Sequence, residues 1–288
     1  MNKSYIYIII AAVFWGTIGI FIKDLQKTGF TSMQMVFFRA SVTAVCVFFY
    51  IFFTDPKKLK IDIKDGWMFI GTGLLSVAFF NFCYITTIQN IGLTTAAILL
   101  YTAPVFVSIL SVILFKEKFT VKKIGALFMA VLGCIFVSGI MNSNEDINLS
   151  GFIIGLFSGI GYALYSIFAR YALNKYDTIT VILFTFVLAS LGTMPFANIS
   201  LLVPLLSSGA NIIKVIATGV VTSVIPYICY TTGLRGVETS KASIVASIEP
   251  VVAAAIGIIM FNEPIKLSVV FGMLLVLSAV ILLNAKSR

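Results

Sequence analysis

Two ionisable residues stand inside long apolar segments, where charge is costly and therefore marks candidate function. Arg39 lies about six residues, or roughly 9 Å, inside segment 33–53, and Glu249 lies about seven residues, or roughly 10 Å, inside segment 242–261. Arg39 could contact an anion or a carboxylate, pair with a buried acid, or extend its side chain to the membrane surface. Glu249 could bind a proton or a cation, could be a neutral acid bonded to nearby backbone, or could be a partly hydrated interfacial residue. A direct ion pair between them is disfavoured, because their depths leave about 10 Å between them across a core of about 30 Å.

Aromatic and amide side chains recur three residues apart in the same kind of segment. Residues with this spacing share one face of a helix. The pairs are Asn81 and Tyr84, Tyr162 and Tyr165, and Tyr227 and Tyr230. Such faces could line a cavity for an organic solute with an apolar body and polar ends, or could serve interhelical packing and the membrane interface. The residues that we predict to bind a solute are Trp15, Arg39, Asn81, Tyr84, Tyr101, Tyr162, Tyr227 and Tyr230.

Two prolines, Pro104 and Pro250, also lie inside apolar segments. Proline removes a backbone hydrogen bond and bends a helix. A membrane helix tolerates this where neighbouring groups or cavity water satisfy the freed carbonyl. The two bends could be static kinks, or they could shape and hinge a pathway.

The residues on which most enzymes rely are scarce. The chain has no histidine, which removes the commonest proton shuttle and metal ligand, and most of its 11 acidic residues lie in polar turns. Its four cysteines fall in apolar segments without CxxC spacing, so neither a disulfide framework nor a metal cluster is predicted. No GxxxxGKS/T loop is present to bind ATP phosphates. We therefore predict a protein that is not an enzyme, with no catalytic residue, metal or cofactor.

Composition indicates that these residues lie in a membrane. Of 288 residues, 60% are hydrophobic and 11% are charged, and the mean hydropathy is +1.08. A soluble fold of this size could not enclose so much apolar side chain. The apolar blocks are long enough to cross about 30 Å of hydrocarbon as helices. We predict an all-α integral membrane protein with ten spans, at residues 5–22, 33–53, 67–89, 94–115, 121–140, 150–174, 180–200, 212–234, 242–261 and 267–284.

Basic residues fall unevenly on the turns between these spans. If the N-terminus is cytoplasmic, 15 of the 20 lysines and arginines lie on the cytoplasmic side, 4 lie outside and Arg39 lies within a span. Because cytoplasmic loops retain basic residues, we predict that both termini are cytoplasmic. The net charge of +9 then faces anionic lipid headgroups and requires no nucleic acid.

The chain also aligns with itself at a shift of 146 residues through the fourth and ninth spans. The pairs that carry most weight are Pro104 with Pro250 and Glu117 with Glu263. Each repeat has five spans, an odd number, so the second copy must enter the bilayer from the opposite side. The turn at 115–118 is therefore predicted inside and the turn at 261–264 outside. Inverted repeats place a binding site near the midplane between the halves and expose it to each side in turn, which predicts a carrier.

Several short motifs occur in the order and spacing of a known family. They are FWG at 14–16, FFRA at 37–40, APV at 103–105 with FKE at 115–117, and EPV at 249–251 with FNEP at 261–264. On these motifs the chain resembles an EamA-type member of the drug/metabolite transporter superfamily, with two EamA domains at 1–141 and 150–288. The resemblance implies a ten-helix carrier of small metabolites such as amino acids, often an exporter, in the cell inner (plasma) membrane. It does not specify the solute.

The leading hypothesis is a secondary-active or facilitative transporter in which Glu249 is the candidate coupling residue and Pro104 and Pro250 are the candidate hinges or kinks. The expected partners are a small-molecule substrate and the lipid bilayer, and the sequence leaves monomer and homodimer open. The alternative is a membrane receptor or assembly protein that binds a ligand without moving it. Flux through the purified protein in liposomes distinguishes the two.

Overall fold

The computed structural model describes residues 3–138 and 148–284, and within these ranges the chain is helical and contains no strand. The link between the predicted halves, from Asn142 to Asn148, lies almost wholly outside the described residues, and so do Lys286 and Arg288. Nine helical segments in the described ranges are long and apolar enough to cross a membrane. A tenth apolar segment, Leu267–Leu283, is slightly shorter. The prediction of an all-α, ten-span membrane protein is confirmed.

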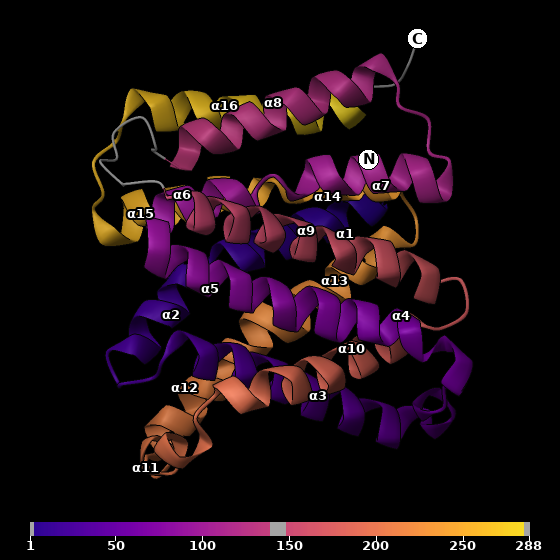
Figure 1. The fold of residues 1–288 in the computed structure, drawn as a ribbon, viewed down its shortest axis with the longest axis vertical. Coiled ribbons are helices and arrows are strands. Elements are labelled where there is room, and N and C mark those ends of the chain that lie inside the picture. Colours follow the sequence, from indigo (N-terminus) through magenta and orange to yellow (C-terminus); the bar gives the residue numbers. More distant parts are fainter. Residues whose placement is uncertain (1–2, 139–147, 285–288) are drawn as a thin grey trace.

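The first half contributes five spans (Figure 1). Three of them are composite, because a short break or a π-helical stretch divides each into two helices. The elements are α1 (Lys3–Gly16) with α2 (Ile18–Gln26), α3 (Ser32–Thr54), α4 (Gly66–Ile70) with the π-helix η3 (Gly71–Ala78) and α5 (Phe79–Ile91), α6 (Leu93–Leu100) with α7 (Ala103–Phe115), and α8 (Val121–Ser138).

The second half also contributes five spans, of which two are composite. Its elements are α9 (Leu149–Ala172), α10 (Thr178–Thr193), α12 (Gly209–Gly219) with the π-helix η7 (Val220–Val224) and α13 (Ile225–Leu234), α14 (Thr239–Ala246) with α15 (Ile248–Phe261), and α16 (Leu267–Asn284). The seventh span ends earlier than the predicted residue 200, because Pro195 lies in a short 3-10 turn, η5 (Met194–Phe196), that closes α10. The small helix α11 (Leu202–Leu206) follows in the connection to α12.

Three spans are interrupted near their middles. The first breaks at Thr17, whose hydroxyl donates a hydrogen bond to the Phe14 carbonyl at 2.7 Å. The fourth breaks just before α7, of which Pro104 is the second residue, and the ninth breaks at Ser247, just before α15. Proline suits the first turn of a helix, where its missing N–H has no partner to lose. The prolines therefore begin new helices rather than bend continuous ones.

The repeat seen in the sequence is also a repeat in backbone geometry. Helices α6 and α14 begin and end 146 residues apart, at 93 and 239 and at 100 and 246. Both α7 and α15 end in a left-handed residue, Lys116 at φ 53° and ψ 33° and Asn262 at φ 54° and ψ 35°. The backbone amide of the residue that follows donates a hydrogen bond back into the helix at equivalent positions of the repeat. The Glu117 amide donates to the Ser111 carbonyl at 3.3 Å, and the Glu263 amide donates to the Gly257 carbonyl at 3.1 Å.

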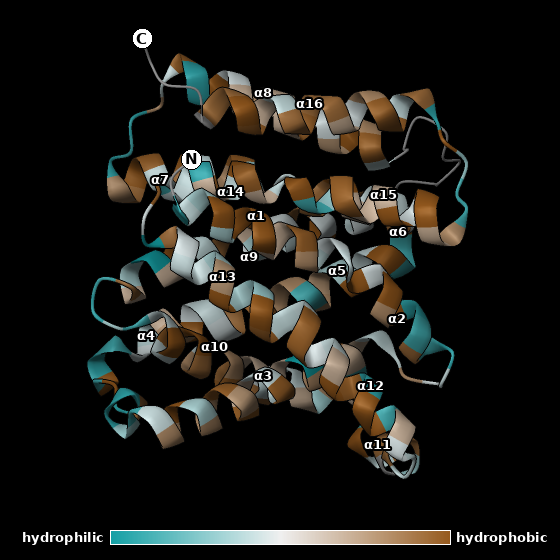
Figure 2. Ribbon diagram, turned by 180° about the vertical axis from the view of Figure 1, so that it is seen from behind, coloured by the Kyte–Doolittle hydropathy of each residue, from teal (hydrophilic) through white to brown (hydrophobic). Residues whose placement is uncertain are grey.

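The two matched turns lie at opposite ends of the bundle. In Figures 1 and 2 the α7–α8 turn is at one side and the α15–α16 turn at the other. We call these the Lys116 end and the Asn262 end. Figure 2 shows hydrophilic residues gathering at both ends and hydrophobic residues along the helices between them. The halves therefore run in opposite senses through one apolar layer, as an odd number of spans per repeat requires.

Helices α8 and α16 lie together along one side of the bundle (Figure 1). They touch backbone to backbone, since a Cβ placed on Gly133 would lie 2.8 Å from the Gly272 carbonyl. Small residues let membrane helices approach this closely. The remaining core joins the halves around Trp15, which is 6% exposed.

Candidate functional site

A small cavity lies where the interrupted spans of the two halves meet. Its volume is about 20 Å³, which is room for about one water molecule. It is lined from α6 and α7 in the first half and from α9, α13, α14 and α15 in the second. The residues on its wall that the sequence analysis named as site residues, together with the serines there, are Tyr101, Pro104, Tyr162, Ser166, Tyr230, Ser243, Ser247 and Glu249.

An aromatic cluster packs beside this cavity around Trp15, the penultimate residue of α1. The Trp15 ring centroid lies 5.2 Å from that of Tyr227, 5.3 Å from that of Tyr230 and 6.4 Å from that of Tyr162. The Trp15–Tyr227 and Trp15–Tyr162 contacts are edge-on, a geometry that ring quadrupoles favour. Four of the predicted solute-binding residues, from three helices, are therefore in one cluster.

Hydroxyl groups in the cluster have partners across the helices. The Ser166 and Tyr230 hydroxyls lie 2.7 Å apart, and the Tyr165 and Thr231 hydroxyls lie 2.6 Å apart. Both pairs join α9 to α13. Because a buried hydroxyl without a partner is destabilising, these bonds fix how the two helices face each other.

Glu249 lies at the cavity wall in the first turn of α15. The Tyr162 hydroxyl donates a hydrogen bond to its Oε2 at 3.3 Å. The positive end of the α15 dipole favours a carboxylate at this position. Because the span breaks at Ser247, α15 begins beside Glu249, and the positive end of this helix stabilises the carboxylate within the membrane.

Gly16 brings the first span against Glu249. A Cβ on Gly16 would lie 2.9 Å from the Glu249 carbonyl oxygen and 2.6 Å from the Val252 Cβ. Only glycine allows the two broken helices to cross at this distance. The FWG motif thus contributes Trp15 to the cluster and Gly16 to the crossing.

Arg39 binds backbone and not Glu249. Its Nη2 donates to the Thr222 carbonyl in η7 at 3.0 Å. In a π-helix the bonding pattern shifts, so individual carbonyls become available to side chains. Its Nε is buried and has no hydrogen-bond partner among the described residues. None of the ion pairs in this part of the chain joins Arg39 to Glu249. The direct pair that the sequence disfavoured is not formed.

Asn81 and Tyr84 do not line the cavity. Asn81 donates from Nδ2 to the Val77 carbonyl at 2.7 Å, within its own span and at the end of η3. Tyr84 is half-buried one turn further on. The structure brings the other predicted aromatic residues together and leaves these two outside the cavity wall.

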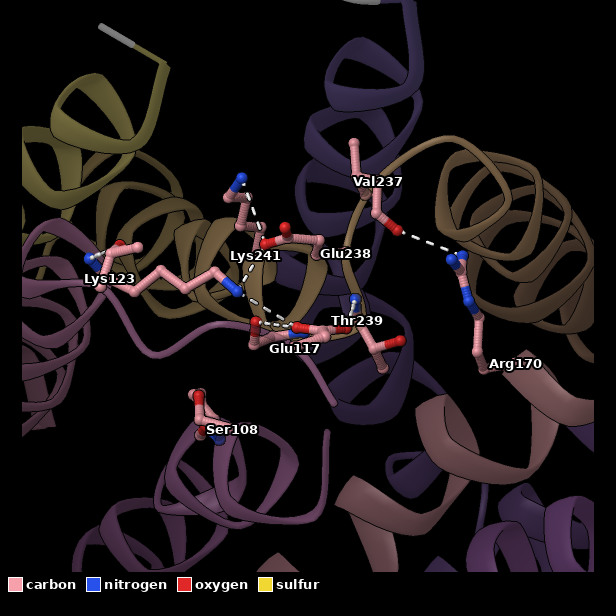
Figure 3. Close-up of polar contacts among 11 residues, drawn as sticks. Ser108, Glu117, Lys123, Arg170, Val237, Glu238, Thr239 and Lys241 are labelled. Atoms are coloured by element: carbon pink, nitrogen blue, oxygen red, sulfur yellow. Dashed lines mark hydrogen bonds and ion pairs between the residues drawn. The ribbon is translucent and has the colours of Figure 1, made fainter. Parts of the chain in front are cut away.

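A buried charged network at the Lys116 end was not predicted as a site (Figure 3). The Glu117 carboxylate accepts from the Thr239 amide at 2.6 Å and from the Ser240 amide at 3.3 Å, and it also bonds the Ser240 hydroxyl. Lys123 Nζ lies 3.3 Å from Glu117 Oε2 and 2.5 Å from Glu238 Oε2. The side chains of Lys123 and Glu117 are 4% and 7% exposed. The sequence marked Glu117 as a repeat position and as part of the FKE motif, but not as a site residue.

Nearby turns at the same end are joined by more exposed pairs. Lys58 Nζ lies 3.0 Å from Asp177 Oδ2, and this hydrogen bond holds the pKa of the Asp177 carboxyl below its usual value. Lys175 donates to Asp65 at 2.7 Å, which raises the pKa of Lys175. These contacts tie the α3–α4 connection to the α9–α10 turn. Across residues 3–138 and 148–284, no group of histidine, cysteine or acidic side chains is placed to hold a metal ion.

Comparison with known proteins gives consistent results over the whole chain. The model of the EamA-like transporter family matches residues 2–139 and again 149–285. A protein of Archaeoglobus fulgidus, named an uncharacterized transporter, is 27% identical over 96% of this chain and 94% of its own length. A Helicobacter pylori protein with the same name is 32% identical over 71% of this chain and 67% of its own length.

A solved crystal structure matches the fold with a TM-score of 0.81, over 99% of this chain and 97% of that one, at 14% identity. At that identity the likeness concerns the fold alone. The two family matches coincide with the two halves whose turns and broken helices repeat, and together they cover nearly every residue. The chain is a multi-pass membrane protein that belongs to the EamA-like transporter family.

Proposed function

We propose that the protein is a secondary carrier that exports small organic metabolites such as amino acids by alternating access between its two inverted repeats. The observation that carries this proposal is that the interrupted fourth and ninth spans, one from each half, line the same cavity between the halves. Irregular backbone at membrane depth is tolerated where it is buried in protein or lines a cavity, and such breaks are typical of carrier binding sites.

The chemistry of the cavity supports a solute with an amino group and an apolar body. The Glu249 carboxylate offers an anionic partner on the cavity wall, and the ring of Tyr162 on the same wall packs edge-on against that of Trp15. Aromatic faces attract cations and pack against apolar groups. A volume of about 20 Å³ holds no metabolite, so solute entry requires the helices to separate.

We assign proton or cation coupling to Glu249 and a carboxylate contact to Arg39 when the pathway opens. The unpartnered Nε of Arg39 supports the second assignment, since a guanidinium binds carboxylates through several donors. We also place the protein in the inner (plasma) membrane with both termini cytoplasmic, on the charge bias of the turns. Tags in the turns at Lys116 and Asn262 should be reached from opposite sides of the membrane, and labelling from one side would refute this.

The test of function is flux through the purified protein in liposomes. If Glu249 couples protons, Glu249→Gln should abolish counterflow driven by a pH gradient and spare exchange of the solute. Asp24→Asn is the matched control, because Asp24 lies outside the cavity and pairs with Lys214 at the bundle surface. Unchanged pH-driven flux in Glu249→Gln would eliminate the coupling assignment. A protein that binds metabolites in a thermal-shift screen but never moves them would be a receptor.

A further inference from the structure

A second cavity, lined by basic side chains, lies at the Lys116 end of the bundle. Its volume is about 310 Å³, which is at the lower end of the range of small-molecule sites. Three connections meet around it: the α3–α4 connection of the first half and the α9–α10 and α13–α14 turns of the second half (Figure 1). We call it the basic pocket, and the charged residues on its wall are Lys57, Lys58, Lys60, Lys175, Asp177 and Arg235.

Hydrogen bonds hold two of these connections against each other. The Thr180 hydroxyl donates to the Lys58 carbonyl at 3.1 Å. The Asp65 carboxylate, whose side chain is 7% exposed, accepts from Lys175 and from the Tyr176 hydroxyl, both at 2.7 Å. The backbone that carries most of the basic residues is therefore fixed before any ligand binds, which favours affinity.

Positive charge on the wall of the basic pocket exceeds negative charge. Asp177 is the single acid among the described residues of the wall, and it contacts Lys58 at 3.0 Å and Arg235 at 3.5 Å. Within residues 3–138 and 148–284, neither Lys57 nor Lys60 forms an ion pair. A cleft lined by charges of one sign concentrates ions of the opposite sign.

The other acids of the α3–α4 connection lie off the wall and do not cancel this charge. Asp55 lies 3.8 Å from Lys58, which already pairs with Asp177. Asp62 accepts a hydrogen bond from the Lys64 amide at 3.0 Å, and Asp65 is occupied by its partners from the α9–α10 turn. Even when these three acids are counted with Asp177, the basic residues of the wall remain in excess.

The repeated fold does not require these charges. At the shift of 146 residues, the five basic positions correspond to uncharged residues at the other end, namely Val203, Pro204, Leu206, Gly29 and Gln89. Membrane insertion explains why basic residues lie on one side of the bilayer. It does not require three separate connections to place theirs around one cavity, so the arrangement indicates a binding site for an anion.

The basic pocket lies where the second span reaches the membrane surface. The last turns of α3 expose Phe49, Phe52 and Phe53, and the rings of Phe49 and Phe53 stack with their centroids 6.2 Å apart. Aromatic side chains are typical of the membrane interface. Because Lys57 follows Phe53 by four residues, the pocket lies at the level of the lipid headgroups, where the phosphates of phospholipids are the most abundant anions.

We propose that the basic pocket binds a phosphate group, and that in the membrane an anionic phospholipid supplies it. Lysine binds a phosphate as a point charge, and the Arg235 guanidinium can bind two of its oxygens at once. Asn174 on the same wall adds an amide donor for the ester or glycerol oxygens of a headgroup. Since the basic residues come from both halves, a bound phosphate joins the halves at the Lys116 end and stabilises this conformation.

Binding to the purified full-length chain in a neutral detergent tests the proposal without any transported solute. The probes are dioctanoyl phosphatidylglycerol, dioctanoyl phosphatidylcholine and inorganic phosphate, each titrated while the melting temperature is followed. Phosphatidylglycerol should raise the melting temperature in a saturable way. Phosphatidylcholine should raise it less, because its headgroup has the same phosphate but no net charge.

Each probe can contradict part of the proposal. Equal effects of the two lipids would show that the chains bind and the pocket does not, which would overturn the proposal. Inorganic phosphate that binds as tightly as phosphatidylglycerol would support the phosphate site but refute the lipid as its source. No effect of either anion would overturn the site itself.

Two double variants separate the pocket from the general basic charge of this end. Lys57→Gln with Lys60→Gln removes two exposed, unpaired charges from the wall, and the dissociation constant for phosphatidylglycerol should rise at least about tenfold. Lys64→Gln with Lys118→Gln removes two exposed charges at the same end but off the wall, and should change it by less than about twofold. Equal weakening in both double variants would show that net charge alone attracts the lipid, and the pocket would be refuted.

Discussion

Substitution of Gly16 by alanine places one methyl group at the crossing of the two broken helices. The added Cβ would lie 2.6 Å from the Val252 Cβ and 2.9 Å from the Glu249 carbonyl oxygen. Carbon atoms prefer to be 3.5 Å apart or more, so α1 and α15 would have to separate by about 1 Å. Neither neighbour can turn away, since one is the branching carbon of a valine and the other is backbone.

We expect Gly16→Ala to destabilise the protein by about 1–3 kcal/mol, the usual effect of one methyl group too many in a packed interior. The same displacement would move Glu249 relative to Tyr162. Solute flux should therefore fall by more than the loss of folded protein accounts for. Reversible unfolding of the detergent-purified protein measures the first effect, and liposome flux per folded molecule measures the second.

Gly19→Ala is the matched control in the same span. A Cβ at Gly19 would have nothing within 4 Å. Alanine there reduces the freedom of the unfolded chain, which stabilises a helix by about 0.4–1 kcal/mol. If Gly16→Ala were as stable and as active as Gly19→Ala, the close crossing of α1 and α15 would be wrong.

Two further predictions concern charged pairs. Lys123→Met should lower the free energy of unfolding by about 3–5 kcal/mol, because it leaves the buried Glu117 carboxylate without its cation. Lys214→Met, at an exposed ion pair, should change the free energy of unfolding by less than about 1 kcal/mol. Equal effects of the two substitutions would contradict the burial of the network. Since Lys58 lowers the pKa of Asp177, the pair stabilises the fold fully above the unfolded pKa of about 4 and loses this contribution as pH falls through the lower folded value. Stability of Asp177→Asn should therefore fall less between neutral and acidic pH than that of the parent, and parallel pH profiles would refute the assignment.

Much of the fold is local and could be predicted. Length and hydropathy place ten spans, and short polar turns separate them, because a helix that crosses hydrocarbon must be apolar over its whole length. The matched Pro104 and Pro250 located the interruptions in the fourth and ninth spans. The interruption at Thr17 and the π-helix η3 were not predicted, since no proline or charge marks them. The π-helix η7 was not predicted either, although Pro226 follows it at the start of α13.

The candidate site was predicted in part. The tyrosines of α9 and α13 were identified by their spacing of three residues, and the structure brings Tyr162, Tyr227 and Tyr230 to Trp15. The same spacing for Asn81 and Tyr84 did not place them on the cavity wall. A shared helical face is a local property, whereas the direction of that face depends on how the helix is rotated against its neighbours.

Sequence periodicity, the odd number of spans per repeat and the charge of the turns were enough to derive a two-fold inverted membrane bundle. The partners of its polar side chains were not derivable in this way. Glu249 meets Tyr162 across 87 residues, Glu117 meets Thr239 across 122, and Arg39 meets Thr222 across 183. Hydropathy specifies only how deep a residue lies, while helix rotation and crossing, which come from the packing of the whole bundle, specify what it touches.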